Sequence, residues 1–177
     1  LLLRLKGAQW VLVSSHLRNR MAYRKQIEVI PNLISNSGHQ LAPYVTQSPK
    51  LIFIGRLSRE KDPALFVEIV DASGMGGLMI GEGILFDALV GQIQSSNLSI
   101  KLLGQLENPW ENIHDKDIIV ITSKYEGDGL VLIEAMLRGL AVLVRDIPDL
   151  RRFNLPDANY FQTSEDATKK ISEYLEK

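Results

Sequence analysis

The chain has 177 residues, with 20 basic and 21 acidic side chains and no cysteine. This length suffices for one well-buried domain, and the balanced charge argues against a general nucleic-acid-binding surface. The lack of cysteine excludes disulfides, zinc–thiolate sites and cysteine nucleophiles, and it fits a cytoplasmic location. The opening segment 1–6 is too short and too charged for a signal peptide or a membrane span. Because the chain also lacks an initiator methionine, we expect it to be part of a longer protein.

Basic residues dominate the first 25 positions. They precede the first acid, Glu28, and are Arg4, Lys6, Arg18, Arg20, Arg24 and Lys25. Such a patch could contact anionic lipid at the inner face of the cell membrane, as a peripheral interaction. A solvated surface, or one that meets another domain, is the commoner explanation of the same residues.

Strands and helices alternate along the chain, which predicts a doubly wound α/β fold with a parallel sheet covered on both faces. Strands are expected at 9–13, 27–30, 51–54, 78–80, 100–103, 118–122 and 141–145. Helices are expected at 16–24, 63–72, 84–95, 110–114, 130–138 and 164–176, the last with Ser164 as N-cap. We expect residues 1–49 to supply a linker, including a polar loop at 35–49, and first elements packed on the core. Residues 50–177 should then form the main domain.

A basic loop follows the predicted strand at 51–54. It begins at Gly55, carries Arg56 and Lys61, and leads into a helix whose predicted N-cap is Asp62. An arginine offers a planar fork for phosphate oxygens and a lysine a mobile point charge, so both cations are candidate phosphate ligands. Taken alone, two loop cations are more often solvent-facing, and that alternative stays open on these residues.

Two glutamates, Glu126 and Glu134, lie eight positions apart around the start of a predicted helix. Gly127 and Gly129 between them let the backbone approach a ligand closely. The first turn of the helix, from Leu130, offers unpaired N–H groups and a positive dipole end that suit phosphate or sugar oxygens. The two carboxylates could then accept hydrogen bonds from sugar hydroxyls. On spacing alone, a solvated loop acid and a helix-surface acid explain the pair equally well.

The positions of the glycines, aspartates and histidines argue against two other kinds of site, a dinucleotide-binding site and a metal site. The segment 74–77 contains three glycines but precedes a strand, so we expect a helix-ending turn there and no dinucleotide fingerprint. Gly81 and Gly83 do follow a strand, but no third glycine completes an NAD-binding pattern. No metal site is predicted, because Asp115 and Asp117 precede their strand. The histidines also lack ligand spacing; they are His16, His39 and His114.

Taken together, these motifs resemble those of a known family. The string 126–134 resembles the E-x7-E signature of retaining family 4 glycosyltransferases of the GT-B fold. The segment 55–61 resembles the family's G-R-L-x-x-E-K loop, whose arginine and lysine hold the donor diphosphate. Further segments resemble the family in the same order, at 30–32 (where Leu33 replaces a glycine), 78–83 and 100–104. The resemblance spans about two-thirds of the chain.

The resemblance implies that residues 50–177 are a Rossmann-like, nucleotide-sugar-binding domain whose N-terminal acceptor domain is absent. The implied reaction is hexosyl transfer from a nucleoside diphosphate sugar, UDP being the expected nucleotide, to a glycan or glycolipid. Neither a metal nor another cofactor is expected, and the domain alone should bind donor without turnover. A further resemblance, of segment 143–148 to bacterial enzymes that glucosylate diacylglycerol, suggests a lipid acceptor.

The resemblance also implies residue roles. Arg56 and Lys61 would stabilise the leaving diphosphate, Glu126 would bind the donor sugar and Glu134 the ribose. The other residues placed around the donor are Gly55, Gly81, Gly83, Gln105, Leu106, Gly127, Asp128, Gly129 and Leu130, with Gln105 and Leu106 bordering the base.

Asp128 departs from the pattern, because the family often has phenylalanine or another uncharged residue there. Its charge could select a sugar hydroxyl or mark a drifted site. Two other interpretations stay open. A GT-B half could be a non-catalytic nucleotide-sugar-binding or assembly module. An unrelated flavodoxin-like domain would place the Arg56/Lys61 loop and the Glu126/Glu134 loop at different ends of the sheet.

Overall fold

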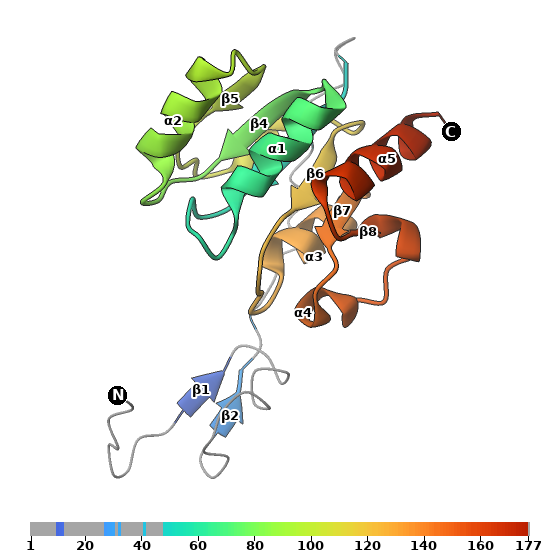
Figure 1. The fold of residues 1–177 in the computed structure, drawn as a ribbon. Coiled ribbons are helices and arrows are strands. Elements are labelled where there is room, and N and C mark those ends of the chain that lie inside the picture. Colours follow the sequence, from blue (N-terminus) through green and yellow to red (C-terminus); the bar gives the residue numbers. More distant parts are fainter. Residues whose placement is uncertain (1–9, 13–26, 31, 33–40, 42–47, 177) are drawn as a thin grey trace.

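The computed structural model describes residues 10–12, 27–30, 32, 41 and 48–176. Its centre is a six-stranded parallel sheet with the order β5-β4-β3-β6-β7-β8 (Figure 1). Two further strands, β1 (Trp10–Leu12) and β2 (Ile27–Val29), pair in parallel as a separate sheet. The predicted doubly wound α/β fold is therefore confirmed.

The strands of the main sheet are β3 (Lys50–Ile54), β4 (Gly76–Ile80), β5 (Ile100–Leu102), β6 (Ile118–Ile121), β7 (Ala141–Arg145) and β8 (Tyr160–Phe161). The α-helices are α1 (Pro63–Ser73), α2 (Phe86–Ser95), α3 (Leu130–Leu137), α4 (Pro148–Arg151) and α5 (Ser164–Leu175). Two 3-10 helices, η2 (Pro109–Asn112) and η3 (Asp157–Asn159), lie in the connections.

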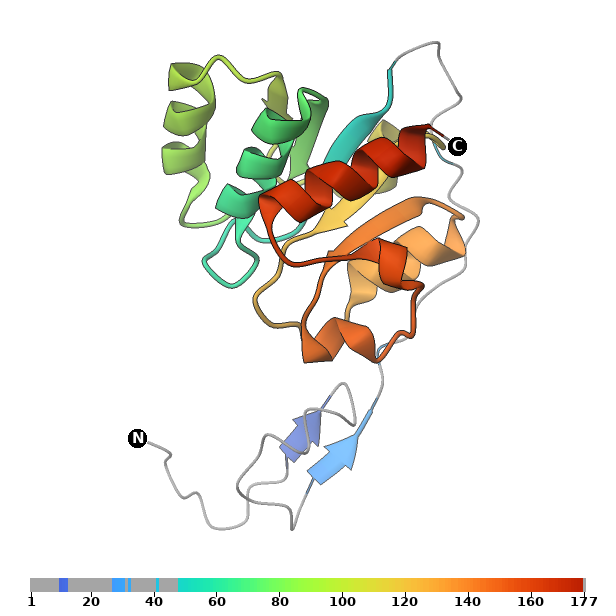
Figure 2. The ribbon, with the colours of Figure 1, turned by 45° about the vertical axis from the view of Figure 1, so that its right-hand side comes forward.

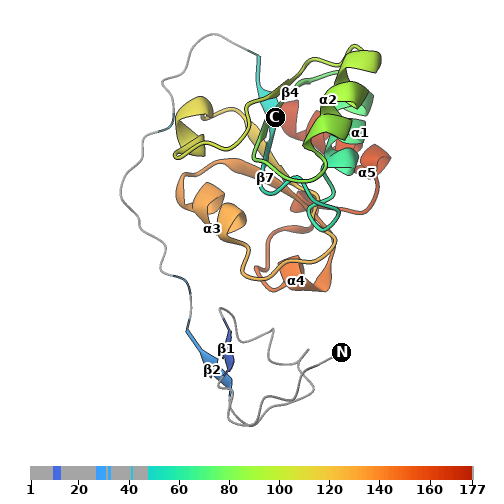
Figure 3. The ribbon, with the colours of Figure 1, turned by 90° about the vertical axis from the view of Figure 1, so that its left-hand side faces the viewer.

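Each face of the sheet has its own hydrophobic core, because side chains alternate between the faces along a strand. Leu51 and Phe53 of β3 pack under α1, α2 and α5, whereas Ile52 between them packs with α3 and the buried Trp110. Figure 2 shows α5 crossing the sheet beside α1, and Figure 3 shows α3 on the opposite side of the sheet. With both faces covered, all four residues of β6 are buried.

The strand order reverses between β3 and β6. From β3 the chain moves outward through β4 and β5, and it then returns to the other side of β3 with β6, where Leu51 lies opposite Ile118. At such a point the loops after the two strands run to opposite faces and leave a crevice at the carboxyl edge of the sheet. The segments with Lys61 and Glu126 both leave this edge, so the flavodoxin-like alternative, with the two loops at different ends, is wrong.

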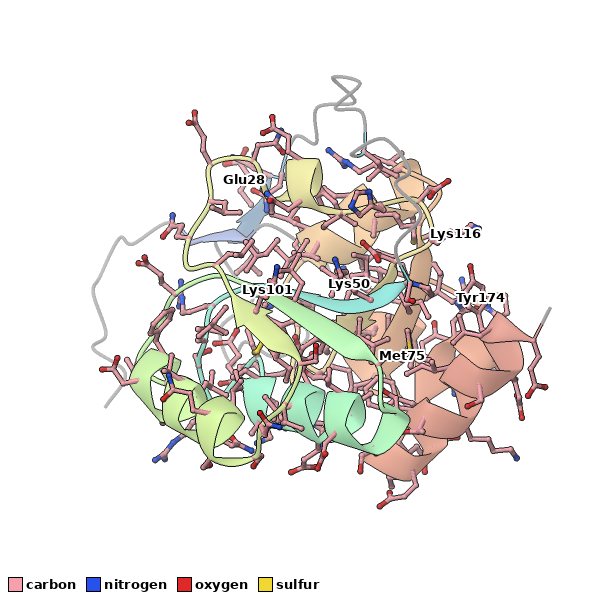
Figure 4. The ribbon with its side chains drawn as sticks, turned by 90° about the horizontal axis from the view of Figure 1, so that it is seen from above. Glu28, Lys50, Met75, Lys101, Lys116 and Tyr174 are labelled. Atoms are coloured by element: carbon pink, nitrogen blue, oxygen red, sulfur yellow. The ribbon has the colours of Figure 1, made fainter. Side chains whose placement is uncertain are left out.

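The opposite edge of the sheet, where the strands begin, is viewed in Figure 4. Asp117 lies there and is 2% exposed. Its carboxylate accepts hydrogen bonds from the N–H groups of Lys50 (2.8 Å) and His114 (2.9 Å). Asp117 therefore joins the starts of β3 and β6, away from the carboxyl edge.

The glycine-rich segment 74–77 is only partly the predicted turn. Gly74 ends α1 with φ 67°, but Gly76 and Gly77 already belong to β4. A Cβ at Gly77 would lie 3.0 Å from side-chain atoms of Val70 on α1 and of Ile100 on β5, so a side chain there would require both neighbours to shift.

Of the two predicted helix caps, Asp62 is confirmed in position and Ser164 is wrong. Asp62 is the N-cap residue of α1, but its side chain makes no capping hydrogen bond. Its carboxylate instead pairs with Arg145 (2.8 Å) and Lys124 (3.3 Å). The N-cap of α5 is Thr163, one residue before the predicted Ser164, and its hydroxyl accepts from the N–H of Asp166.

Several predictions fall outside the described residues. They concern the helix at 16–24, most of the loop at 35–49, the histidines His16 and His39, and the basic residues of the first 25 positions. Within the described part of the chain, no helix has both the length and the apolar character needed to span a membrane.

Candidate functional site

The loops after β3, β4 and β5 lie side by side at the carboxyl edge. The N–H of Gly55 donates to the C=O of Ile80 (3.0 Å), and the N–H of Gly81 donates to the C=O of Gly104 (2.7 Å). Gly81 has φ 145°, and a Cβ at this position would lie 1.9 Å from the carbonyl oxygen of Gly55. Only glycine therefore lets these two loops meet.

Gly83 makes a second close approach to the loop after β3. The N–H of Leu57 donates to the C=O of Glu82 (2.8 Å), and a Cβ at Gly83 would lie 2.3 Å from the carbonyl oxygen of Leu57. The glycine turn expected to face a nucleotide thus has a structural role in joining the loops. An open cavity of about 380 Å³ adjoins the turn and is lined by Glu82, Gly83, Phe86, Leu102, Leu103 and Gly104.

A second cavity, of about 220 Å³, lies at the switch between β3 and β6. Its lining combines the ends of both strands with the basic loop and the start of α3. The residues are Phe53, Ile54, Lys61, Val120, Ile121, Thr122, Ser123, Glu126, Gly129, Leu130, Val131 and Leu132. We call this the switch-point cavity. It brings together four of the predicted site residues: Lys61, Glu126, Gly129 and Leu130.

Lys61 and Glu126 meet directly in the switch-point cavity. The Lys61 Nζ lies 2.6 Å from Glu126 Oε2, and the two side chains are only 24% and 12% exposed. The Ser123 hydroxyl donates to the same oxygen (3.2 Å), and the N–H of Gly127 donates to Oε1 (3.1 Å). The Glu126 carboxylate is thus held by a cation, a hydroxyl and a backbone amide.

The start of α3 forms one wall of the switch-point cavity. Gly129 is the N-cap residue with φ 74°, and no described side chain caps this end of the helix. A Cβ at Gly129 would lie 2.8 Å from the far end of the Phe153 ring, which would have to shift, and the positive φ favours glycine here in any case. The unpaired N–H groups of the first helical turn adjoin the cavity and favour an anion.

Asp128 is tied to groups on both sides of its loop. Its Oδ2 accepts a hydrogen bond from the Asn32 side chain (2.8 Å), and its Oδ1 lies 3.9 Å from the Arg152 guanidinium. Arg152 also donates to the carbonyl groups of Asp128 (2.5 Å) and Gly127 (3.3 Å). The residue that departs from the family pattern therefore links the loop to residue 32 of the preceding linker.

Arg56 and Glu134 line neither of the two cavities described above. Arg56 is exposed on the loop after β3, and Glu134 is half-buried on the second turn of α3. Leu106 packs partly against the core that contains Trp110, whereas Gln105 is exposed. In the described part of the chain, no set of three His, Asp or Glu side chains gathers as possible metal ligands.

Sequence reasoning missed three polar residues near the switch-point cavity. Thr122 and Ser123 are 1% and 2% exposed, and Asp149 is 4% exposed with an oxygen 2.8 Å from the N–H of Glu126. Polar residues directly after the buried strand β6 were a usable signal for the first two. Asp149 lies 23 positions from Glu126, and no local pattern links them.

Comparison with known proteins gives one family. The family model described as glycosyl transferases group 1 matches residues 39–177. The chain is 30% identical over 129 residues to an N-acetylgalactosamine-N,N'-diacetylbacillosaminyl-diphospho-undecaprenol 4-alpha-N-acetylgalactosaminyltransferase of Campylobacter jejuni. It is 31% identical over 114 residues to a poly(ribitol-phosphate) alpha-N-acetylglucosaminyltransferase of Staphylococcus aureus. These matches cover 69% and 60% of this chain, but only 35% and 23% of the relatives.

Solved structures show the same fold at lower identity. A mutant of S. aureus TarM, in complex with fondaparinux, alpha-GlcNAc-glycerol and UDP, superposes with a TM-score of 0.75 at 22% identity. The match covers 96% of this chain and 37% of that one. The pneumococcal O-GlcNAc transferase GtfA, in complex with UDP and GlcNAc, gives a TM-score of 0.68 at 18% identity and covers 94% and 38% of the two chains.

Proposed function

Because this chain belongs to the group 1 glycosyltransferase family, we propose that it is the donor-binding domain of a retaining hexosyltransferase. In this proposal the domain binds a nucleoside diphosphate sugar, with UDP as the nucleotide. The sugar is transferred to a glycan or glycolipid acceptor that is held mainly by another domain. No metal or other cofactor is assigned to the reaction.

One observation carries the proposal. The switch-point cavity places a cation, a carboxylate and a helix N-terminus around one space at the carboxyl edge of the sheet. A diphosphate needs positive charge and N–H donors, whereas a sugar needs hydrogen-bond acceptors. Lys61 and the first turn of α3 would supply the former, and Glu126 the latter.

The chemical step places growing negative charge on the diphosphate. The bond from the anomeric carbon to the diphosphate oxygen breaks, and both of its electrons go to that oxygen. A hydroxyl oxygen of the acceptor forms the new bond to the anomeric carbon, and its proton passes to the released diphosphate. Lys61 would leave Glu126 to pair with the diphosphate, and the N–H groups around Gly129 and Leu130 would add fixed donors. Arg56, exposed on the same loop as Lys61, would reach the phosphates from outside the cavity. Glu134 would bind the ribose.

The relatives support the choice of donor and acceptor. The structures of the TarM mutant and of GtfA contain UDP. The two curated relatives are named for transfer to a diphospho-undecaprenol glycan and to poly(ribitol-phosphate). A glycolipid or a polymer is therefore the acceptor class we propose. A peripheral membrane contact through the basic residues of the first 25 positions stays a prediction.

A non-catalytic binding module is the second candidate. The Lys61–Glu126 ion pair favours it, because two charges that already neutralise each other can be a structural contact. The two functions differ in the step after binding. Both would bind UDP, but only a transferase would release UDP from the donor sugar when the acceptor domain and an acceptor are present.

A calorimetric panel of UDP, GDP, ADP and their sugars against the chain tests donor binding. We expect UDP to bind weakly, in the range of micromolar to millimolar Kd, and the Lys61→Ala variant to bind more weakly still. Equal binding of UDP by both proteins would contradict the proposed role of the switch-point cavity. Binding of GDP or ADP in preference to UDP would correct the nucleotide.

A further inference from the structure

Residues at the end of β7 and the start of α4 contact the backbone or the neighbours of both Lys61 and Glu126. We propose that Arg145 and Asp149, at the two ends of the segment 145–149, are positioning residues that set the placement of Lys61 and Glu126 before a donor binds. This inference rests on the proposed function, since it concerns the same cavity.

Arg145 acts on the Lys61 side. Its guanidinium donates to the carboxylate of Asp62 (2.8 Å) and to the C=O of Thr122 (3.2 Å). The Thr122 hydroxyl in turn donates to the C=O of Lys61 (2.7 Å). The C=O of Lys61 and the side chain of Asp62 are thereby held by residues at the ends of β6 and β7.

The backbone of Asp62 indicates that these contacts impose a conformation. Asp62 has φ 50° and ψ 55°, the left-handed region that residues other than glycine seldom adopt. Its carboxylate does not cap α1 but faces Arg145 and Lys124. Such a conformation persists where surrounding contacts determine it, and Arg145 makes the less exposed of the two ion pairs with this carboxylate.

Asp149 acts on the Glu126 side. Its carboxylate is 4% exposed and accepts a hydrogen bond from the N–H of Glu126 (2.8 Å). Burying a carboxylate is unfavourable without hydrogen-bond donors, so this contact holds the two segments together. It fixes the backbone of Glu126, whereas Lys61, Ser123 and Gly127 hold the side chain.

The two anchors share one short connection, which begins at the end of β7, where the strand pairs with β6 on one side and with β8 on the other. When a diphosphate draws the Lys61 ammonium away from Glu126, the attraction between the two side chains no longer holds them in position. The contacts from Arg145 and Asp149 remain, because they act on backbone or on Asp62. A site that keeps its geometry when its charges change partners is preorganised for binding and for the transfer step.

Variants of Asp149 separate positioning from charge. Asp149→Asn keeps an oxygen that can accept from Glu126, whereas Asp149→Ala removes it. Hydrogen exchange of the Glu126 amide in the unliganded chain reports the contact directly, and calorimetry with UDP reports its effect on the site. We expect Asp149→Ala to speed this exchange and to weaken UDP binding, each by roughly tenfold, and Asp149→Asn to recover most of both.

Two further variants complete the test. Arg145→Lys keeps the charge but shortens the side chain, whose Nη1 contacts both Asp62 and Thr122. We expect this change to weaken UDP binding by roughly three- to tenfold. Asp146→Asn is the matched control, since Asp146 lies on the same segment but bonds the surface residue Arg151. We expect it to leave both the exchange and the affinity unchanged. Protection of the β6 amides shows whether each variant is folded.

The outcomes are distinct. If Glu126 exchanges at the wild-type rate in folded Asp149→Ala, or if Asp149→Asn fails to recover what Asp149→Ala loses, the role of Asp149 is overturned. Should Asp149→Ala not fold, the other two variants decide. If Asp149→Asn and Arg145→Lys both bind UDP with wild-type affinity, and neither exchanges the Glu126 amide faster, the result supports acceptor geometry at Asp149. The same result overturns the role of Arg145. If wild type binds no UDP while the exchange still responds as expected, the proposed function fails and the positioning of Glu126 stands.

Discussion

Lys61 and Glu126 are 65 positions apart in the chain, and their charged groups lie 2.6 Å from each other at the switch point of the sheet. Each is a candidate ligand for a different part of one donor molecule. In the unliganded protein they satisfy one another. A donor that binds here must therefore separate them, and this requirement shapes the expected behaviour of variants.

Removing the cation should weaken nucleotide binding. In Lys61→Ala, UDP loses a charge-assisted contact, which we expect to cost about 1.5–3 kcal/mol of binding free energy. Lys101→Ala, which removes an equal charge from β5, is the control and should change the affinity by less than about 0.5 kcal/mol. Titration calorimetry on both proteins decides the matter. A similar loss in the two variants would mean that net charge, and not the switch-point cavity, drives binding.

Removing the anion should have the opposite effect on UDP alone. Glu126→Gln leaves Lys61 without its charged partner, so a diphosphate no longer competes with a carboxylate, and UDP affinity should rise by roughly three- to tenfold. The same change should reduce the advantage of a UDP-sugar over UDP, if Glu126 holds the sugar hydroxyls. An unchanged preference for the UDP-sugar, measured by paired titrations, would argue that Glu126 serves Lys61 and not the donor.

The glycine turn after β4 should tolerate no side chain. Gly81→Ala would place a Cβ 1.9 Å from the carbonyl oxygen of Gly55, and we expect a loss of about 3 kcal/mol or more in the free energy of unfolding. The control is Gly91→Ala on α2, where no atom lies within 4 Å of the added Cβ. That change should stabilise the helix by about 0.5–1 kcal/mol. Urea unfolding of the two variants measures the contrast, and equal midpoints would show that the loops can separate freely.

Stability in acid should depend on Asp146. A hydrogen bond from Arg151 is the main cause that lowers the pKa of Asp146, and burial opposes it. Because the pKa of Asp146 is lower in the folded state, the ionised carboxylate stabilises the fold fully at pH values above its ordinary pKa, about 3.9. This stabilisation disappears as the pH falls through the lower pKa of the folded state. Because this pair is near the surface, we expect Asp146→Asn to cost below about 1 kcal/mol at neutral pH. The difference from wild type should vanish in unfolding experiments at low pH, and its persistence there would contradict the ionic origin.

The sequence supported the fold for a physical reason. Parallel strands bring their carboxyl ends to one edge, so the alternating pattern placed the loops after β3 and β6 at the same edge, and the strand order then makes the two strands neighbours. Because both faces of the sheet are buried, the strands are runs of apolar residues that can be recognised in the sequence. The long separation of these segments along the chain did not matter, because the topology joins them.

Other features had no local signal. The two-residue strand β8 and the four-residue helix α4 are too short to show a period. That Asp62 would bind Arg145, 83 positions further along the chain, depends on how the loop after β3 passes the end of β6 to reach the end of β7. The direct contact of Lys61 with Glu126 likewise depends on side-chain directions that no spacing encodes. Gly81 and Gly83 were expected to face a ligand, which stays a prediction; what the structure shows is their role in backbone packing.

The most direct test follows the backbone amide signals of the labelled chain by NMR while UDP is added. Binding at the switch-point cavity predicts that the largest shifts occur at the basic loop, residues 55–61, and at the start of α3, residues 129–132. The amides around Asp117, at the opposite edge of the sheet, should stay unchanged. Shifts confined to that opposite edge, or none at UDP concentrations up to several millimolar, would contradict the assignment of this cavity as the donor site.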